Sequence, residues 1–504
     1  MNHWPSPGAQ ALRYALLSLA SLAAIALSES ILQSPSSLYV AFQPATFANE
    51  SWALLALVSS MALAGAWLDH PGRQRWLSAA IRGLLLLLLF VGLFQIFRRT
   101  LASPLVLSAA LKAGLLGLCV VATISAAWRL KPAAQWRLAS ACGITVLVMF
   151  ALQPGMPGYL LNMLYPPQAS PVISDTPQGE NPRRTIVLIL DEWDFEISQR
   201  EQLFTSEPMR RMLAQSFFAE HAMPAGPSTL SSIPGMLTGR RFGKIDSGGA
   251  GFLLNTQGER FDASTPMLFN DLASAGRPHA VVGFYHDYCA VVRTARACYA
   301  EPAQFFPGWW SSLSRAFKRQ QEFDYPYSDF LRQWSGTFQK LSNRAIVEAA
   351  DPRNTMVWLH LNVPHPPVAA AGATPRSLIE DYRANLQQML TLISELQTTL
   401  QRAGNDSALV LTSDHWLREK ELWASVYERQ RGPGSGSAGK SDDQRVPFIV
   451  WFSGATNQGI SSAVPVSTTA LRALVPALIE GRINNPSEVA AFFAERKDPV
   501  EPIK

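Results

Sequence analysis

Five apolar runs within the first 152 residues constrain this chain more than any other feature. They cover residues 11–27, 51–68, 82–97, 104–128 and 138–152. Each is close to the roughly 20 residues that a helix needs to cross the hydrocarbon core of a bilayer, although the third and fifth are short. The chain is 48% hydrophobic and 16% charged, and its apolar excess is concentrated in the first 165 residues. The pattern predicts a bundle of five transmembrane helices.

The short loops between these runs predict how the bundle is oriented, because Lys and Arg favour the cytoplasmic side. The loop after the first run is acidic, whereas the loops after the second and fourth runs carry the basic residues Arg73, Arg75, Arg129, Lys131 and Arg137. We therefore expect the N-terminus in the cytoplasm and everything after residue 152 on the outer side. Further spans follow the weakly charged first run, so it does not read as a cleavable signal peptide.

After the bundle, the sequence pattern changes twice. Residues 153–183 are rich in Pro and Gly and predict an interfacial linker. From residue 184 onward, short β-branched and aliphatic runs alternate with helical patterns such as residues 375–402; the runs are 185–190, 280–285, 355–361, 408–412 and 447–452. Runs without polar alternation are typical of strands buried on both faces of a parallel sheet. Residues 184–504 are therefore expected to form an α/β domain around a central, mostly parallel sheet.

Polar residues follow three of these predicted strands. Asp191 and Glu192 follow the first, while the other two contribute the sets Ser413, Asp414 and His415, and His360 and His365. Chemistry in such sheets occurs beyond the carboxyl ends of the strands. Carboxylate and imidazole ligands suit zinc or a harder divalent ion, although a single Asp can equally cap a helix.

A hydroxyl-rich segment, residues 227–240 with the sequence PSTLSSIPGMLTGR, allows two interpretations. In the first, a Ser or Thr simply caps the start of a helix. In the second, a hydroxyl nucleophile stands at a helix start, where the dipole and the free N–H groups favour an anion. Such a hydroxyl needs a metal or a base to attack.

Cysteine content and charge add two expectations. Eight residues separate Cys289 from Cys298. If this part lies outside the cytoplasm, a disulfide between them is expected, the alternative being two unpaired thiols. The formal net charge is +5, and no basic stripe interleaved with aromatic residues occurs. Nucleic acid is therefore not an expected partner.

Taken together, these motifs resemble the alkaline phosphatase/sulfatase superfamily. The segment TLSSIPGMLTGR is similar to its nucleophile motif and is closer still to that of bacterial phosphoethanolamine transferases. The pair Asp191-Glu192, the SDH at 413–415, the VWLHLNVPHPP at 357–367 and the RVP at 445–447 match further family motifs in collinear order. Five helices before such a domain also resemble the lipoteichoic acid synthases.

The resemblance implies a role for each matched residue. Thr229 would be the nucleophile and form a phospho-threonine intermediate, with Ser232 as the motif serine that binds substrate. The metal, zinc or manganese, would be held by Asp191, Asp414 and His415, with Glu192 as a further candidate. His365, together with His360 or His286, would bind the phosphate or protonate the leaving group.

The resemblance also implies a function. We expect a multi-pass enzyme of the bacterial inner membrane whose periplasmic domain moves a phosphoethanolamine or phosphoglycerol headgroup from a phospholipid donor to an envelope glycan or lipid. A phosphodiesterase or phosphatase of the same fold and a non-catalytic envelope assembly protein are the alternatives. Sulfate hydrolysis is disfavoured, because a threonine cannot mature to the formylglycine that sulfatases use.

One departure from the transferases concerns residues 416–444. The transferases carry a further histidine soon after the Asp-His pair, whereas this segment has none and contains the Gly- and Ser-rich stretch 429–444, which predicts a flexible insert. Arg418, Lys420 or Lys440 could bind phosphate in place of that histidine, or all three could be solvated surface charges.

Overall fold

The computed structural model describes residues 183–245, 265–286, 288–302, 327–367, 376–404, 406–440, 442–455 and 459–496, with the isolated positions 14, 15, 17, 18, 60, 253–255 and 261. The chain divides into two compact units, and every described residue from 183 onward belongs to the second. Within the described part of the chain, no helix combines the length and the apolar character that a membrane span requires. The five transmembrane helices predicted over residues 1–152 and the linker over 153–183 lie almost entirely outside the described residues and stay predictions.

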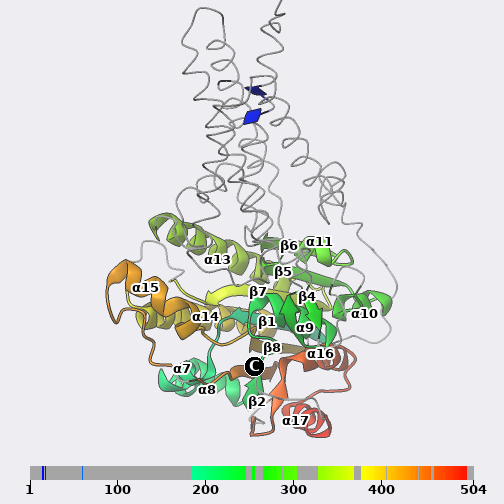
Figure 1. Ribbon diagram of the computed structural model, residues 1–504. Coiled ribbons are helices and arrows are strands. Elements are labelled where there is room, and N and C mark those ends of the chain that lie inside the picture. Colours follow the sequence, from blue (N-terminus) through cyan, green and yellow to red (C-terminus); the bar gives the residue numbers. More distant parts are fainter. Residues whose placement is uncertain are drawn as a thin grey trace, which may run out of the picture. The chain divides into compact units, whose positions relative to one another are not determined.

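A nine-stranded sheet forms the centre of the second unit (Figure 1). Its strand order is β10-β2-β9-β8-β1-β7-β5-β6, and β11 also pairs with β2. The strands are β1 (Arg184–Asp191), β2 (Ser216–Met223), β5 (His279–Tyr285), β6 (Ala297–Pro302), β7 (Met356–Pro364), β8 (Ser407–Ser413), β9 (Val446–Phe452), β10 (Ile460–Ser462) and β11 (Val466–Ser467). A separate antiparallel pair consists of β3 (Phe242–Ile245) and β4 (Leu253–Asn255).

The sheet is mostly parallel, as the apolar runs predict. Strands β1, β7, β8 and β9 are buried along their whole length, which explains why their sequences show no polar alternation. One direction differs from the prediction: β9 runs antiparallel to both β2 and β8. A strand that is buried on both faces has the same apolar pattern in either direction, so the sequence could not distinguish the two.

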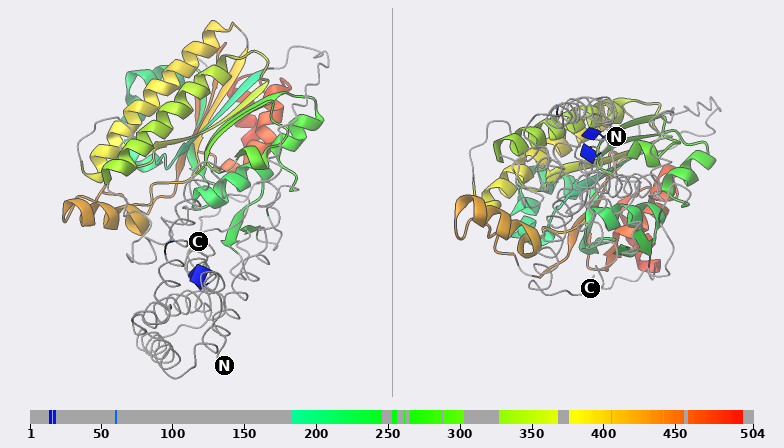
Figure 2. Two further views of the ribbon diagram at one scale, coloured as in Figure 1. Left: turned by 90° about the horizontal axis from the view of Figure 1, so that it is seen from above. Right: turned by 45° about the horizontal axis from the view of Figure 1, so that its top comes forward.

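Helices cover both faces of the sheet (Figure 2). The long helices α13 (Tyr327–Ala350) and α14 (Leu378–Arg402) lie along one face, and α9 (Thr229–Thr238), α10 (Leu268–Ser274) and α16 (Leu471–Ile479) lie on the other. Shorter or peripheral helices are α7 (Phe195–Arg200), α8 (Glu207–Leu213), α11 (Tyr288–Val291), α15 (Ala424–Arg431) and α17 (Pro486–Glu495). A π-helical turn, Glu419–Trp423, precedes α15.

Helix α14 shows why the helical prediction over residues 375–402 was accurate. Leu386, Met389, Ile393 and Leu396 recur at intervals of three and four, and all are buried against the core. At its start, the Ser377 backbone N–H and side chain both donate to the Glu380 carboxylate, forming a capping box. The helix therefore begins where the sequence supplies both a cap and an apolar stripe.

Candidate active site and metal centre

The carboxyl ends of three neighbouring strands bring the predicted site residues to one edge of the sheet. Strand β1 lies between β7 and β8, with Leu190 opposite Ser413 and Ile189 opposite His360. Asp191 is the last residue of β1, and Asp414 directly follows β8. Parallel pairing therefore places side chains that are more than 200 residues apart in sequence next to one another.

Thr229 is the first residue of helix α9 and its side chain is buried. Ser228 precedes it in an extended conformation, and the Ser232 N–H donates to the Ser228 carbonyl, which starts the helix. The tight approach to this start requires a glycine, because a Cβ at Gly226 would lie 2.3 Å from the Ser231 Oγ. Ser228 is the N-cap residue but makes no side-chain capping hydrogen bond, and Thr229 follows it at the helix start.

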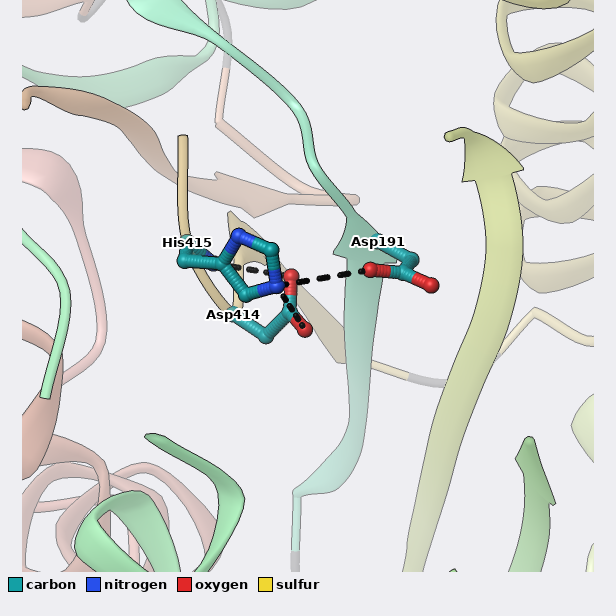
Figure 3. A group of neighbouring side chains, drawn as sticks. All are labelled: Asp191, Asp414 and His415. Atoms are coloured by element: carbon teal, nitrogen blue, oxygen red, sulfur yellow. Dashed lines mark hydrogen bonds and ion pairs between the residues drawn. The ribbon is translucent and has the colours of Figure 1, made fainter. Parts of the chain in front are cut away.

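Asp191, Asp414 and His415 form a compact group of possible metal ligands (Figure 3). One ligand atom from each residue lies within 4.8 Å of the other two, and all three residues are buried. The His415 Nε2 is 3.4 Å from the Asp414 Oδ2 and 3.8 Å from the Asp191 Oδ1. We call this group the metal cluster.

The hydrogen bonds around the metal cluster leave one oxygen of each aspartate available for a cation. Among the described residues, neither the Asp191 Oδ1 nor the Asp414 Oδ2 has a hydrogen-bond partner, although both are buried. The His415 Nδ1 lies 2.9 Å from the Trp416 carbonyl and must donate to it, so the proton is on Nδ1 and Nε2 carries a lone pair. Two carboxylate oxygens and an imidazole nitrogen facing each other fit zinc or manganese.

The pKa values of the two aspartates also indicate a site for a cation. Burial, together with the charges of Asp414 and Glu192, raises the pKa of Asp191 well above its usual range. Burial also acts to raise the pKa of Asp414, but His415, His360 and the hydrogen bonds from Thr229 and the Glu192 N–H together lower that pKa. The negative charge of Asp191 is therefore poorly stabilised by this chain alone, and a divalent cation bound here would offset it.

The Thr229 hydroxyl adjoins the metal cluster. Its Oγ1 lies 3.2 Å from the His415 Nε2, which accepts its hydrogen bond. The predicted nucleophile and the predicted metal ligands are therefore brought together at one point. A hydroxyl beside a cation site is the arrangement that lowers the pKa of the hydroxyl and makes it nucleophilic.

Glu192 was a further candidate ligand, and the structure places it outside the metal cluster. Its backbone has a left-handed φ of 58°, which turns the chain so that the Asp191 and Glu192 side chains meet different partners. The Glu192 Oε1 accepts from the Arg418 Nε at 3.2 Å, and the Oε2 accepts from the Trp423 Nε1 at 2.7 Å. Burial raises the pKa of this carboxyl even though Arg418 and His415 oppose the rise.

The three predicted histidines surround this centre but have separate partners. The His286 Nε2 donates to the Thr229 carbonyl at 3.1 Å, and burial lowers the pKa of His286 to about 3. His360 is hydrogen bonded through Nδ1 to the Tyr288 hydroxyl at 2.9 Å, and burial lowers its pKa to about 4. Both histidines are therefore neutral. His286 supports the first turn of α9 through the Thr229 carbonyl, and His360, in β7, is held by Tyr288.

His365 is held between two tryptophan rings. Its ring centroid is 4.8 Å from that of Trp334 and 4.9 Å from that of Trp423. The Nδ1 donates to the Pro366 carbonyl, and burial lowers the pKa of His365 to about 3. The Nε2 lies 3.9 Å from the Glu192 Oε2, so His365 faces the Glu192 side of the site.

Ser232 lies in the first turn of α9. It is fully buried, and its Oγ has no hydrogen-bond partner among the described residues. Its predicted role in binding substrate is therefore not matched by a contact with the metal cluster.

The three basic residues proposed as phosphate ligands have different positions. Arg418 reaches Glu192 beside the metal cluster, whereas Lys420 pairs with Asp442 on the exposed surface at 2.7 Å. Lys440 is buried and its Nζ lies 2.8 Å from the Asp194 Oδ2. Of the three, only Arg418 pairs with the residue adjacent to Asp191 in the metal cluster.

The segment 429–444 was predicted to be flexible, and the structure instead shows it packed on the domain. The Leu378 N–H donates to the Ser435 carbonyl at 2.9 Å, and Ala438 is buried in the core. At Gly436 an added Cβ would lie 2.3 Å from the Ala424 carbonyl oxygen, so the glycine permits close packing. Glycine here serves contact rather than mobility.

No sequence pattern indicates the role of several residues that organise the site. The Tyr382 hydroxyl donates to the Glu192 carbonyl and accepts from the Asp194 N–H, both at 2.8 Å. Trp334 and Trp423 enclose His365, and Tyr288 fixes His360. Aromatic residues in apolar sequence usually belong to the core, and only the spatial arrangement gives these their role.

The predicted disulfide is present. Cys289 in α11 and Cys298 in β6 are joined, with their Cα atoms 5.7 Å apart. It links the segment that follows His286 to the edge strand of the sheet.

Comparisons with known proteins add a family assignment. The model of the sulfatase family matches residues 186–475, which is more than half of the chain. No curated protein sequence matches.

Among solved structures, Ps i-CgsB in complex with k-i-k-neocarrahexaose is 17% identical, with 63% of this chain and 79% of that chain covered and a TM-score of 0.40. The integral membrane protein lipooligosaccharide phosphoethanolamine transferase A from Neisseria meningitidis is 12% identical, with coverage of 90% and 95% and a TM-score of 0.34. The C-terminal periplasmic domain of EcEptC from Escherichia coli is 15% identical, with coverage of 60% and 83% and a TM-score of 0.34. Similarity at this level carries no conclusion about function.

Proposed function

The chain belongs to the sulfatase family, and from this we propose that it is a membrane-bound, metal-dependent transferase. It moves a phospholipid-derived phosphoryl headgroup, phosphoethanolamine or phosphoglycerol, to an envelope glycan or lipid. The observation that carries the proposal is the Thr229 hydroxyl, whose Oγ1 lies 3.2 Å from the His415 Nε2 of a buried ligand group.

Asp191, Asp414 and His415 would hold the metal. The Asp191 Oδ1 and the Asp414 Oδ2 have no hydrogen-bond partner among the described residues, and the His415 Nε2, whose neighbour is the Thr229 hydroxyl, carries a lone pair. Zinc or manganese bound there would lower the pKa of the threonine hydroxyl and offset the negative charge of the phosphate. The start of the ten-residue helix α9 adds a favourable field for the same anion.

In the first half of the reaction, the Thr229 Oγ forms a bond to phosphorus. The bond from phosphorus to the lipid oxygen breaks, and that oxygen leaves with a proton as diacylglycerol. In the second half, the oxygen of an acceptor hydroxyl loses its proton and forms a bond to the same phosphorus. The bond from phosphorus to the Thr229 Oγ breaks, and Thr229 regains a proton. The His365 Nε2 carries a lone pair, because the ring proton is on Nδ1, so this nitrogen suits the acceptor's proton better than it suits donation to the leaving group.

Two further features support placement of this chemistry at a membrane facing an oxidising compartment. The five apolar runs before residue 152 would anchor the enzyme beside its lipid donor. The Cys289–Cys298 disulfide is of a kind that persists in the periplasm and is rare in the cytosol. We therefore place the protein in the inner membrane, with this domain in the periplasm.

The test uses the full-length chain in detergent, with phosphatidylethanolamine or phosphatidylglycerol labelled in the headgroup. Label is expected on Thr229, and Thr229→Ala should lower turnover about 1000-fold or more, since it removes the nucleophile. The matched control is Ser228→Ala, which removes the neighbouring hydroxyl and should keep the label.

The fate of the label then separates the proposed function from its alternatives. Transfer that requires an added glycan or lipid acceptor supports the transferase, while release to water at the same rate without an acceptor identifies a hydrolase. Wild-type protein that is never labelled contradicts covalent chemistry at Thr229, and an envelope assembly role would then be favoured.

A further inference from the structure

Arg418 places a guanidinium group beside the metal cluster. Its Nε donates to the Glu192 Oε1 at 3.2 Å, and the other carboxylate oxygen of Glu192 accepts from the Trp423 Nε1 at 2.7 Å. The Glu192 side chain is 0% exposed, whereas the Arg418 side chain is 29% exposed. The arginine therefore forms the accessible side of this pair, and Glu192 with Trp423 forms the fixed support behind it.

Most of the donors of Arg418 remain available. A guanidinium carries five N–H donors, and the contact with Glu192 through Nε uses one. The Arg418 side chain forms no other hydrogen bond or ion pair with a residue in the described part of the chain, although its backbone carbonyl accepts from the Trp423 N–H. The planar fork of the remaining N–H groups matches two oxygens of a phosphate group.

The charges at the site require a second positive group when a phosphate ester binds. Asp191 and Asp414 together offset one divalent cation, so an incoming anionic ester would add charge without a partner. The described residues contain one group of three metal ligands, and the nearby carboxylate of Glu192 is already paired with Arg418. Arg418 thus supplies the positive charge next to Glu192.

We propose that Arg418 binds the phosphoryl oxygens of the ester at Thr229 and replaces a second metal ion on Glu192. This inference rests on the proposed function for the identity of the ester but not for the presence of the anion site. Arg418 contacts substrate directly, whereas Glu192 and Trp423 are positioning residues that orient the guanidinium.

The experiment measures binding of inorganic phosphate to the zinc-loaded, full-length chain by titration calorimetry. Arg418→Gln is expected to weaken phosphate binding at least tenfold. Arg418→Lys keeps the charge but loses the planar fork of N–H groups, so its phosphate affinity is expected to lie between those of the wild type and Arg418→Gln. Lys420→Gln is the matched control, because Lys420 pairs with the exposed Asp442 and should bind phosphate as the wild type does. Zinc content should be one ion per chain in all four proteins.

Two results would overturn the inference: phosphate binding by Arg418→Gln at wild-type affinity, or two zinc ions per wild-type chain at saturation. Because Arg418→Gln leaves the buried Glu192 without its partner, the double variant Glu192→Gln/Arg418→Gln provides a second comparison with no unpaired charge. Weak phosphate binding by a folded double variant supports the inference, and wild-type affinity in it overturns the inference.

Failure of this inference is distinguishable from failure of the proposed function. If phosphate binding depends on Arg418 but no headgroup is ever found on Thr229, the anion site stands and the transferase is rejected. If Thr229 is labelled but Arg418→Gln binds phosphate as tightly as the wild type does, the transferase stands and the role of Arg418 is rejected.

Discussion

Four carboxylates near the ends of β1 and β8 fall into two groups with different surroundings. Glu192 and Asp194 each have a positive partner from the segment after β8, supplied by Arg418 and Lys440 respectively. Asp191 and Asp414 pair with no lysine or arginine in the described part of the chain; the His415 Nε2, which carries a lone pair, lies 3.8 Å from the Asp191 Oδ1 and 3.4 Å from the Asp414 Oδ2. All four are buried to a similar degree.

The difference separates carboxylates that the chain pairs with its own cations from carboxylates that it does not. A buried carboxylate is costly unless it is paired, and the described residues provide a partner for Glu192 and Asp194 but not for Asp191 and Asp414, which the proposed metal would satisfy. Adjacent residues such as Asp191 and Glu192 can thus differ completely in role. Three predictions test this division, from the largest expected effect to the smallest.

Removing an internal cation should destabilise the fold. Lys440→Met leaves Asp194 buried without its partner, and loss of one member of a buried pair costs about 3–5 kcal/mol. Lys420→Met, a change of the same type on the exposed surface, should leave the unfolding midpoint unchanged. Thermal or chemical unfolding of both variants measures the difference. Equal midpoints would show that Asp194 does not depend on Lys440, and Asp194→Asn/Lys440→Met should recover part of any loss.

Replacing a carboxylate should weaken zinc binding strongly at Asp191 but not at Glu192, because only Glu192 is paired with a basic side chain of the chain itself. Asp191→Asn removes a ligand and should weaken zinc binding more than about 100-fold, or about 2.7 kcal/mol, because loss of a mere supporting contact already costs 10–100-fold. Glu192→Gln should change zinc affinity by less than about tenfold. Competition with a chelator gives both affinities. A similar loss of zinc affinity in the two variants would mean that Glu192 is also a metal ligand, and would contradict the distinction between the two groups of carboxylates.

If charge at the site is confined to the carboxylates and their cations, the histidines behind Thr229 must stay neutral. The pKa of His286 is about 3 and that of His360 about 4, whereas both are about 6.5 in the unfolded chain. The unfolded state therefore binds more protons below pH 6.5, and stability falls as the pH drops from about 6.5 towards 4. Each histidine contributes up to about 1.4 kcal/mol per pH unit in that window.

The pH prediction is tested by melting the wild type and His360→Asn at several values between pH 7 and pH 5. The variant should lose less stability on acidification, because one buried neutral histidine is gone. A pH dependence as steep as that of the wild type would mean that His360 is not the group that titrates.

The sequence predicted well where the candidate site residues meet, because the information was local. The apolar runs before Asp191 and before Ser413 are strands, and the two residue sets do meet, since parallel neighbours end at the same edge. The hydroxyl-rich motif likewise identified Thr229 at a helix start beside His415. A family motif and a strand pattern together were enough for these residues.

What the sequence could not predict depends on contacts between distant residues or on one backbone angle. Lys440 lies in a Gly- and Ser-rich stretch that reads as flexible, and its partner Asp194 is 246 residues away. Glu192 reads as a second metal ligand until its left-handed φ directs it to Arg418 and Trp423. Neither the Lys440–Asp194 ion pair nor the left-handed φ of Glu192 can be recognised from the periodicity or composition of the sequence.

The most direct test of the central claim is an intact-mass measurement of the purified protein combined with its metal content. The account predicts one divalent metal ion per chain and a headgroup-sized adduct that is absent from Thr229→Ala, which should keep the metal because Asp191, Asp414 and His415 remain. A protein that carries no metal and no adduct, even after exposure to zinc and lipid donor, would contradict it.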